Sequence, residues 1–393
     1  MAKTLLLTGG TGFIGSHLAA RFIEQGHFIY FLARADRRLS AEERILRALA
    51  PLLTPAKDRY RVLDGELTLP LEIDTGDIDE VWHCAASLSF KETERDNTFA
   101  ANVTGTKNLL RWIERRNIQR LHHISTAYVV GDQGGVAGED ELERGQGFHN
   151  PYEESKLAAE HSVRTWSERT GGRATIYRPS IIVGDSRTGF APKFGGYYSC
   201  ARHFLAVRQI LQADLQQNPG RYAESGIKSR GALLHLPVYF PGIPDTLVNI
   251  LPIDLAVDAM LACSKSDGTF HITNSQPIRL DRLVGMSMES MGISGVAVGN
   301  ASAVTHPLIF QLNEQIKQAV KYFRPYAAYG ANSPIFDQTN TMRILGRPLR
   351  LEITEPFLRC ILSSTSGARP PSRRKSSDDA GRRKRPAQRL SIN

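Results

Sequence analysis

A tyrosine and a lysine, Tyr152 and Lys156, are four residues apart in a segment of strong helix formers that follows Pro151. Four residues make about one helical turn, so the two side chains share a helix face. A phenol has an ordinary pKa of about 10, and an ammonium group within about 4–6 Å favours the phenolate and lowers that pKa. Such a pair can give a proton to an oxygen atom that gains charge while a hydride reaches the neighbouring carbon. A tyrosine and a lysine at this spacing are common by chance, so the rest of the sequence must support a catalytic interpretation.

Two hydroxyl side chains, Ser125 and Thr126, lie in the predicted strand 121–128, which precedes the Tyr152 segment. A hydroxyl at the carboxyl end of a strand can donate a hydrogen bond to a carbonyl group that is being reduced. Together with the tyrosine and the lysine, these hydroxyls indicate proton and hydride transfer at a carbonyl group. That chemistry needs a bound hydride carrier.

The first residues of the chain predict the element that binds such a carrier. Leu5–Leu7 form an apolar run without a polar face, which is typical of a strand buried on both sides in a parallel sheet. Gly9, Gly12 and Gly15 follow, and residues 16–25 have the apolar spacing of a helix. In a dinucleotide site the first glycine permits a tight turn, the second lets the backbone approach a pyrophosphate, and the third lets the helix pack close to the strand. The phosphates would bind the N–H groups at the helix N-terminus.

The residues after the second predicted strand, 28–33, bear on the choice of carrier. A site specific for NAD usually ends this strand with an acid that binds the ribose hydroxyl. Arg34 stands there instead, with Arg37 close behind, and a guanidinium group matches a 2′-phosphate in charge and geometry. We therefore expect NADP (NADPH), with NAD less favoured. Asp36 keeps open the interpretation that these arginines only solvate a loop.

Strands and helices alternate through the first 180 residues. This alternation predicts an α/β fold with a Rossmann-type doubly wound parallel sheet and a site at the carboxyl ends of its strands. After Gly189 the alternation ends, which indicates a smaller, mostly helical substrate domain. We expect the NADP-binding domain to comprise residues 1–190 and 249–275, the substrate domain 191–248 and 276–362, and a disordered basic tail 363–393.

Composition narrows the class of protein. The net charge of +9 is concentrated in residues 366–393, where nine basic and two acidic residues leave only +2 for the remainder, so we expect no specific nucleic-acid partner. The four cysteines are far apart, and no metal site is predicted. No apolar run approaches the ~18 residues of a membrane span, and Met1 leads directly into the first strand, so we expect a cytoplasmic protein. Nothing in the sequence specifies the oligomeric state.

Six motifs resemble those of the extended short-chain dehydrogenases/reductases: Thr8-Gly-Gly-Thr-Gly-Phe-Ile-Gly15, Ala85-Ala86, Asn102-Val-Thr-Gly105, Ser125-Thr126, Tyr152-x-x-x-Lys156 and Tyr177-Arg-Pro-Ser180. The resemblance implies that Tyr152 is the acid/base and that Lys156 holds the nicotinamide ribose and lowers the tyrosine pKa. It further implies that Thr126, in preference to Ser125, polarises the carbonyl, and that Asn102 supports the proton path. The cofactor contacts that it implies, together with the arginines above, are Thr8, Gly9, Thr11, Gly12, Phe13, Ile14, Arg34, Arg37, Glu66, Ala85, Ala86, Lys156, Pro179 and Ser180. Glu66 stands where the family usually has an aspartate near the adenine.

Further strings are similar to one branch of that family, which contains fatty acyl-CoA reductases and thioester-reductase domains: His83-Cys-Ala-Ala, Ser125-Thr-Ala-Tyr128, Arg178 to Gly189, Val248 to Asp254 and Pro334 to Asn340. This resemblance implies NADPH-dependent reduction of an acyl thioester, carried by CoA or a carrier protein, to an aldehyde or alcohol. The alternatives are a ketone or alcohol oxidoreductase or a nucleotide-sugar epimerase with the same residues, and a non-enzymatic NADP sensor.

Several residues have two interpretations. Arg187 either meets a phosphate of CoA or phosphopantetheine or forms a structural ion pair, and His83 is expected to be a packed strand residue. On the helix 197–216, one apolar face either lines an acyl channel or packs into a core: Phe204, Val207, Leu211 and Leu215. The aromatic residues after the helix 311–323 either wall a pocket or pack: Tyr322, Tyr326 and Tyr329.

Overall fold

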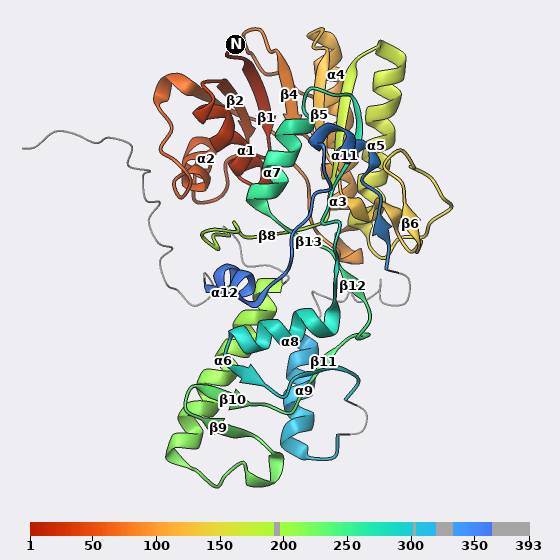
Figure 1. The fold of residues 1–393 in the computed structure, drawn as a ribbon. Coiled ribbons are helices and arrows are strands. Elements are labelled where there is room, and N and C mark those ends of the chain that lie inside the picture. Colours follow the sequence, from red (N-terminus) through yellow and green to blue (C-terminus); the bar gives the residue numbers. More distant parts are fainter. Residues whose placement is uncertain (192–196, 302–303, 320–332, 364–393) are drawn as a thin grey trace, which may run out of the picture.

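The computed structural model describes residues 1–191, 197–301, 304–319 and 333–363. Figure 1 shows two lobes, an upper one built on a sheet and a smaller lower one, joined by several crossing segments. Tyr322, Tyr326, Tyr329 and the basic tail from residue 364 lie outside the described residues, so the predictions for them stay predictions.

A seven-stranded parallel sheet forms the centre of the upper lobe, with the strand order β14-β7-β5-β4-β1-β2-β3. Its strands are β1 (Thr4–Thr8), β2 (Phe28–Ala33), β3 (Tyr60–Asp64), β4 (Glu80–His83), β5 (Arg120–Ile124), β7 (Arg173–Pro179) and β14 (Gly268–Ile272). The chain order reverses between β1 and β4, and open α/β sheets bind ligands at this point. The predicted Rossmann-type α/β fold is confirmed.

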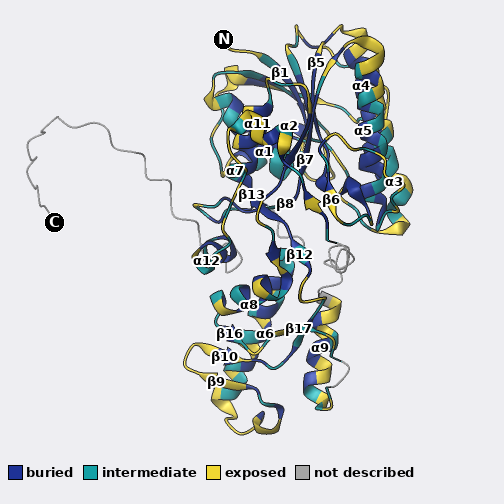
Figure 2. Ribbon diagram, turned by 45° about the vertical axis from the view of Figure 1, so that its right-hand side comes forward, coloured by how far each residue is buried: buried dark blue, intermediate teal, exposed yellow. Residues whose placement is uncertain are grey.

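Helices cover both faces of this sheet, because successive strand residues point to opposite sides. Leu5 and Leu7 pack with α1 (Phe13–Glu24), α2 (Ala41–Leu49) and α7 (Ile253–Cys263), whereas Leu6 packs with α4 (Gly105–Arg115) and α5 (Pro151–Thr170). Each of these leucines is at most 1% exposed, and burying such a side chain stabilises the fold by about 1.5–3 kcal/mol. Figure 2 shows the buried strands between helices whose outer faces are exposed. The sheet is therefore a rigid platform for residues at its edge.

The lower lobe has an apolar core of its own between α6 (Tyr197–Gln217), α8 (Leu280–Ser290), α9 (Pro307–Ala319) and α12 (Glu355–Ser363). Phe204, Val207 and Leu211 are buried in this core, so their structural role is packing. Short strands complete the lobe: β9 (Lys228–Arg230), β10 (Leu233–His235), β11 (Tyr239–Pro241), β16 (Ile293–Ser294) and β17 (Ala297–Gly299).

Paired strands also join the two lobes or bring distant segments together. β8 (Ile181–Val183) pairs with β13 (Ile250–Pro252), β12 (Leu247–Val248) with β15 (Ile278–Arg279), and β6 (Val136–Ala137) with β18 (Ile335–Phe336). After β18, α11 (Thr339–Leu345) packs on α7 and β14 of the upper lobe. The structure thus places β18 and α11 with the sheet, whereas the sequence grouped them with the substrate half. The cause is a pairing between segments that are far apart in the chain.

Candidate active site

The glycine turn after β1 has little room for side chains. Gly9 has φ +72°, and a Cβ there would lie 2.5 Å from the backbone of Cys84 and Ala85. A Cβ on Gly15 would overlap the Gly9 carbonyl oxygen, and the Gly12 N–H donates to that same oxygen at 2.8 Å. Gly10, to which the sequence analysis gave no role, lies against the Phe31 ring, where a Cβ would come within 2.6 Å. The turn therefore needs glycine for close packing as well as for its backbone conformation.

The turn leads directly into α1, whose first residue is Phe13. Gly12 is the N-cap and provides no side-chain hydrogen bond to the helix, so the first N–H groups are available for an anion. Half-buried Ala85 and exposed Ala86 follow β4 beside the turn, and the Ala85 N–H donates to the Thr8 hydroxyl at 3.2 Å. The glycine turn and the uncapped helix N-terminus have the arrangement that suits the phosphates of a dinucleotide.

Beyond β2 and β3, Arg34 and Glu66 form an ion pair with an N···O distance of 3.0 Å. Their side chains are 67% and 41% exposed, so both remain accessible to a ligand. Arg37 is also exposed. Asp36 accepts from the Leu39 N–H at 2.9 Å and pairs with Arg44 of α2 at 3.3 Å. Asp36 is therefore engaged in holding its own loop, and Glu66 is the acid that faces Arg34.

Helix α5 carries the tyrosine and the lysine. Its N-terminus is capped by Asn150, whose side chain accepts from the Glu153 N–H at 3.0 Å. Tyr152 is half-buried, and its ring packs edge-on against Phe90 at a centroid distance of 5.6 Å. Lys156, one turn later, is 2% exposed and donates from Nζ to the Ile124 carbonyl at 2.5 Å. Burial lowers the pKa of Lys156 to about 8.

The hydroxyls of Ser125 and Thr126 lie where β5 ends. The strand stops at Ile124 instead of continuing to Tyr128 as predicted, because the Thr126 hydroxyl accepts from the Tyr128 N–H at 3.3 Å and starts a 3₁₀ turn, Ala127–Val130. Thr126 is 4% exposed. Since its oxygen accepts this bond, its hydrogen can be donated to a carbonyl oxygen. Ser125 is held close by through its N–H, which donates to the Tyr177 carbonyl at 2.7 Å.

Asn102 lies in a π-helical turn, Ala100–Thr104, which interrupts the predicted helix between α3 (Arg95–Phe99) and α4. Its side chain accepts from the Ser87 N–H at 2.7 Å and donates to the Ser87 carbonyl at 3.1 Å and to the Ser155 hydroxyl at 2.9 Å. The Ser155 hydroxyl donates in turn to the Tyr152 carbonyl at 2.9 Å. Asn102 therefore binds the loop after β4 to the helix that carries Tyr152.

A buried ion pair that the sequence analysis missed lies behind the lysine. Glu160, one turn after Lys156, is fully buried and accepts two hydrogen bonds from Arg178, at 3.0 and 2.8 Å. Burial acts to raise the pKa of Glu160, but Arg178 outweighs it and holds that pKa below its ordinary value. The Glu160 carboxylate also opposes the loss of charge at Lys156. The recurrence of polar residues at every fourth position from Tyr152 was the signal that could have found it.

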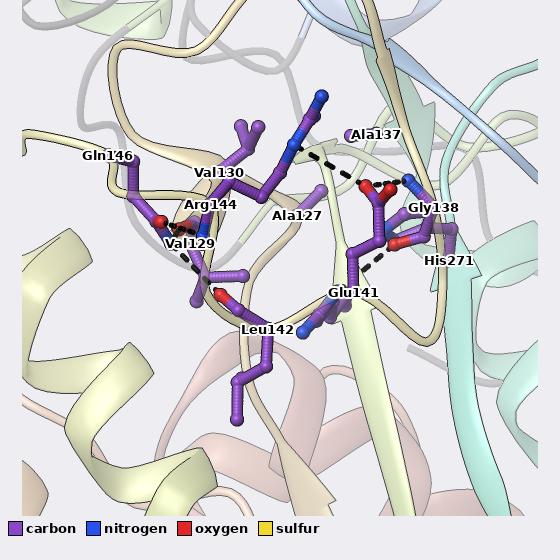
Figure 3. A pocket seen from close by; sticks show the side chains of 11 residues that line it. Ala127, Val129, Val130, Ala137, Gly138, Glu141, Leu142, Arg144, Gln146 and His271 are labelled. Carbon is purple, nitrogen blue, oxygen red and sulfur yellow. Dashed lines mark hydrogen bonds and ion pairs between the residues drawn. The ribbon is translucent and has the colours of Figure 1, made fainter.

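A small pocket lies between the segment that follows β5 and residues of β7 and β14 (Figure 3). In its wall, Glu141 accepts from the Gly138 N–H at 2.9 Å and faces Arg144 at 3.6 Å. The lining residues are Ala127, Val129, Val130, Ala137, Gly138, Glu141, Leu142, Arg144, Gln146, Arg178 and His271. Residues of the loop 138–146 thus line this pocket, and Glu141 makes its polar contacts within the same loop.

Arg187 lies at the junction of the lobes, in the loop between β8 and α6. Its guanidinium group is 3.5 Å from Asp185 and 3.9 Å from Asp254, yet the side chain is 68% exposed. Ser180 is fixed to the sheet edge, where its N–H donates to the Ile272 carbonyl at 3.1 Å.

Within the described ranges, no group of histidine, cysteine or acidic side chains has the arrangement of a metal site, and no helix is long and apolar enough to cross a membrane.

Residues 7–260, which include every predicted catalytic residue, match the model of a family described as male sterility protein. The chain belongs to this family. The resemblance inferred from the motifs above is thereby confirmed at the level of the family.

The chain is also similar in sequence to an individual characterised protein. The chain is 31% identical over 192 residues to a 3 beta-hydroxysteroid dehydrogenase/Delta 5-->4-isomerase of Mycobacterium tuberculosis, covering 46% of this chain and 47% of that protein. It therefore spans about half the length of this relative.

Two solved structures have the same fold. The terminal R domain of the myxalamid PKS-NRPS pathway is 23% identical, with a TM-score of 0.72 over 93% of this chain and 91% of that chain. A thiolation-reductase di-domain of an archaeal non-ribosomal peptide synthetase is 21% identical, with a TM-score of 0.66 over 93% of this chain and 76% of that chain. At sequence identities this low, the structural similarity shows a shared fold and nothing about function.

Proposed function

We propose that this protein is an NADPH-dependent reductase of an acyl thioester and that its product is an aldehyde or alcohol. The observation that carries the proposal is the set of Thr126, Tyr152 and Lys156 at the carboxyl edge of the sheet, next to an uncapped helix N-terminus that suits a dinucleotide phosphate. The membership in the male sterility protein family supports it.

The proposed chemistry divides among these side chains. Bound NADPH would supply a hydride to the thioester carbonyl carbon. Thr126 donates a hydrogen bond to the carbonyl oxygen, and Tyr152 stabilises the same oxygen as negative charge develops on it. The tetrahedral adduct collapses when the carbon–sulfur bond breaks, so the thiolate leaves and takes up a proton, and an aldehyde remains. Lys156 binds the nicotinamide ribose and, as an ammonium group, favours the phenolate. A second hydride would reduce the aldehyde to the alcohol.

The preference for NADP over NAD rests on the arginines after β2. Arg34 is exposed and has Glu66 as its partner, so a 2′-phosphate can replace or join that carboxylate. Arg37 adds positive charge nearby. For the thioester, the exposed face of Arg187 suits a phosphate of CoA or phosphopantetheine, although its two carboxylate contacts equally suit a structural pair. The R-domain likeness makes a carrier-protein thioester a natural first test.

A panel of acyl-CoA and acyl-carrier thioesters, incubated with NADPH or NADH, tests the proposal. We expect NADPH oxidation together with release of free thiol and of an aldehyde or alcohol identified by mass spectrometry. The Tyr152→Phe variant should slow both by about 10²–10⁴-fold. Cofactor oxidation without either product would contradict the proposal.

The steroid dehydrogenase relative favours a second candidate, an NAD(P)-dependent ketone or alcohol oxidoreductase with the same three residues. A panel of secondary alcohols and ketones with both cofactors tests it, and a UDP-sugar panel tests the related epimerase reaction. A non-enzymatic sensor would bind the cofactor and turn over no member of any panel, and Tyr152→Phe would leave its function intact.

A further inference from the structure

A chain of buried polar residues, linked at one point through the main-chain carbonyl of Asn102, runs from β1 to α5. Its members are Thr8, His83, Thr106, Asn102 and Ser155, and none is more than 1% exposed. His83 is in the middle: its Nδ1 is 2.7 Å from the Thr8 hydroxyl and its Nε2 is 3.0 Å from the Thr106 hydroxyl. Such a buried network is costly when it is broken, because each group that loses its partner remains in a medium of low dielectric constant.

The direction of each hydrogen bond in this chain is determined. The Thr106 hydroxyl has one hydrogen, which it donates to the main-chain carbonyl of Asn102 at 2.6 Å, so it must accept from Nε2–H of His83. Burial, followed by the charge of Lys156, lowers the pKa of His83 to about 3, so the ring is neutral. With the proton on Nε2, Nδ1 accepts from the Thr8 hydroxyl. A single tautomer of a neutral imidazole therefore satisfies both threonines.

The two ends of the chain lie at different parts of the site. At the Thr8 end, the hydroxyl accepts from the Ala85 N–H at 3.2 Å, at the small-residue surface beside the glycine turn. At the Asn102 end, the amide binds the Ser87 backbone and the Ser155 hydroxyl, which donates to the Tyr152 carbonyl. His83 consequently connects the cofactor side of the groove to the helix that presents the acid.

We propose that His83 is a positioning residue, which fixes the Ala85 surface relative to the π-helical turn at Asn102 and thereby aligns a bound dinucleotide with Tyr152. The proposal rests on the proposed function of the site as a dinucleotide-dependent reductase. His83 touches neither substrate nor cofactor in this scheme, and it exchanges no proton. Its contribution is to hold two elements at one separation.

The first test compares two buried histidines. His83→Phe removes both hydrogen bonds of the imidazole, and His122→Phe is the matched control. His122 on β5 is equally buried, but its ring stacks on that of Trp82 with a centroid distance of 3.9 Å. Trp82 packs with the face of the sheet that lies opposite His83. We expect His83→Phe to raise the NADPH Kd, measured by fluorescence titration, by about tenfold and to lower kcat by at least as much, the size of effect that a lost buried partner produces. His122→Phe should lower the melting temperature and leave both values unchanged. Equal effects of the two variants on Kd and kcat would overturn the proposal.

A second pair of variants separates the two halves of the chain and does not depend on replacing the imidazole. Thr106→Val keeps the link from His83 to Thr8 and breaks the link to Asn102, so kcat should fall several-fold while the NADPH Kd stays within twofold of wild type. Thr106→Ser restores the hydroxyl and should restore kcat. Combined with His83→Phe, Thr106→Val should add nothing to the loss of kcat, because both cut the same chain. Additive losses, or no rescue by serine, would overturn the positioning role.

The same titrations separate this proposal from the function on which it rests. If the wild-type protein binds no dinucleotide, the proposed function fails, and the positioning role fails with it. If the wild-type protein binds and oxidises NADPH but His83→Phe behaves like His122→Phe, only the positioning role fails.

Discussion

The two lobes bury different kinds of side chain. The sheet lobe encloses a charged and polar layer at the carboxyl ends of β4, β5 and β7, with Lys156, Glu160 and Arg178 all at most 2% exposed. The lower lobe encloses an apolar core, and its pocket between α6 and α8 is walled mainly by apolar side chains: Tyr197, Cys200, Ala201, Phe240, Leu280, Leu283, Val284, Ser287, Met288 and Met291.

This difference indicates which lobe performs the chemistry. Burying a charge costs free energy unless it is paired and hydrogen-bonded, so a cluster of such groups stabilises a fold poorly. In the sheet lobe that cost is concentrated around one face of α5, where the groups are held in fixed positions close to Thr126 and Tyr152. The lower lobe has no comparable buried ion pair among its described residues and contributes packing and shape.

Replacing one tyrosine in each lobe should give the largest contrast. Tyr152→Phe removes the proposed proton donor, and we expect kcat to fall by about 10²–10⁴-fold with little change in melting temperature. Tyr198→Phe removes a buried hydroxyl that accepts from the Gly184 N–H at 2.6 Å, so stability should fall by about 1–3 kcal/mol while kcat is retained. Steady-state kinetics and thermal unfolding check both. Loss of activity in the Tyr198 variant alone would reverse the roles assigned to the lobes.

An ion pair in each lobe gives the next contrast. Glu160→Gln leaves Arg178 charged and buried without its carboxylate partner, which should cost about 3–5 kcal/mol in denaturant unfolding. Glu355→Gln breaks an exposed pair with Arg359 on α12, where a change of about 0.3–0.5 kcal/mol is expected. Similar losses for the two variants would show that the buried pair is not the structural support described here.

The parts of this arrangement that could be predicted are those encoded by neighbouring residues. The run Leu5–Leu7 and the glycines after it specify strand, turn and helix within one short segment, because burial on both faces and the tight turn depend on adjacent positions. Tyr152 and Lys156 were placed on one helix for the same reason. The recurrence of polar residues along α5 marks Glu160, but its pairing with Arg178 joins two elements, and no local pattern specifies that partner.

Local deviations inside regular elements also escaped prediction. The π-helical turn at Asn102 continues the apolar spacing of its helix, so the pattern shows no break, and β5 ends early because one hydroxyl starts a 3₁₀ turn. Outside the central sheet, strands of two or three residues carry too little pattern to specify a partner. The pairing of Ile335 with Val136 is an extreme case, since nothing near either residue indicates the other.

A pH profile should detect the buried lysine. Burial lowers the pKa of Lys156 from 10.5 to about 8, so between these values the unfolded chain binds a proton that the folded chain does not. The free energy of unfolding should therefore rise with pH between about 8 and 10.5, because the penalty for burying the charge disappears. Activity should instead fall above about pH 8, because the ammonium group is lost. Lys156→Arg keeps the charge and should remove the falling limb. Burial raises the pKa of Cys200 in the lower lobe to about 12, so that thiol does not titrate in this range. If the fall in activity at high pH persists unchanged in Lys156→Arg, another group must cause it.

The smallest effect is expected where the sheet lobe is most exposed, at Arg34. Because its side chain is 67% exposed, solvent and salt weaken its contact with a 2′-phosphate, and Arg34→Ala should raise the NADPH Kd by only about tenfold while the NADH Kd is unchanged. Glu66→Gln should act in the opposite direction by a few-fold, since it removes the carboxylate that competes for the guanidinium group. Arg230→Ala, on the exposed strand β9 of the lower lobe, is the control and should change neither Kd. Titrations at two salt concentrations sharpen the comparison, because the preference for NADPH should shrink with salt in the wild type and be absent in Arg34→Ala. An equal loss of affinity for both cofactors would mean that Arg34 supports the loop and does not read the phosphate.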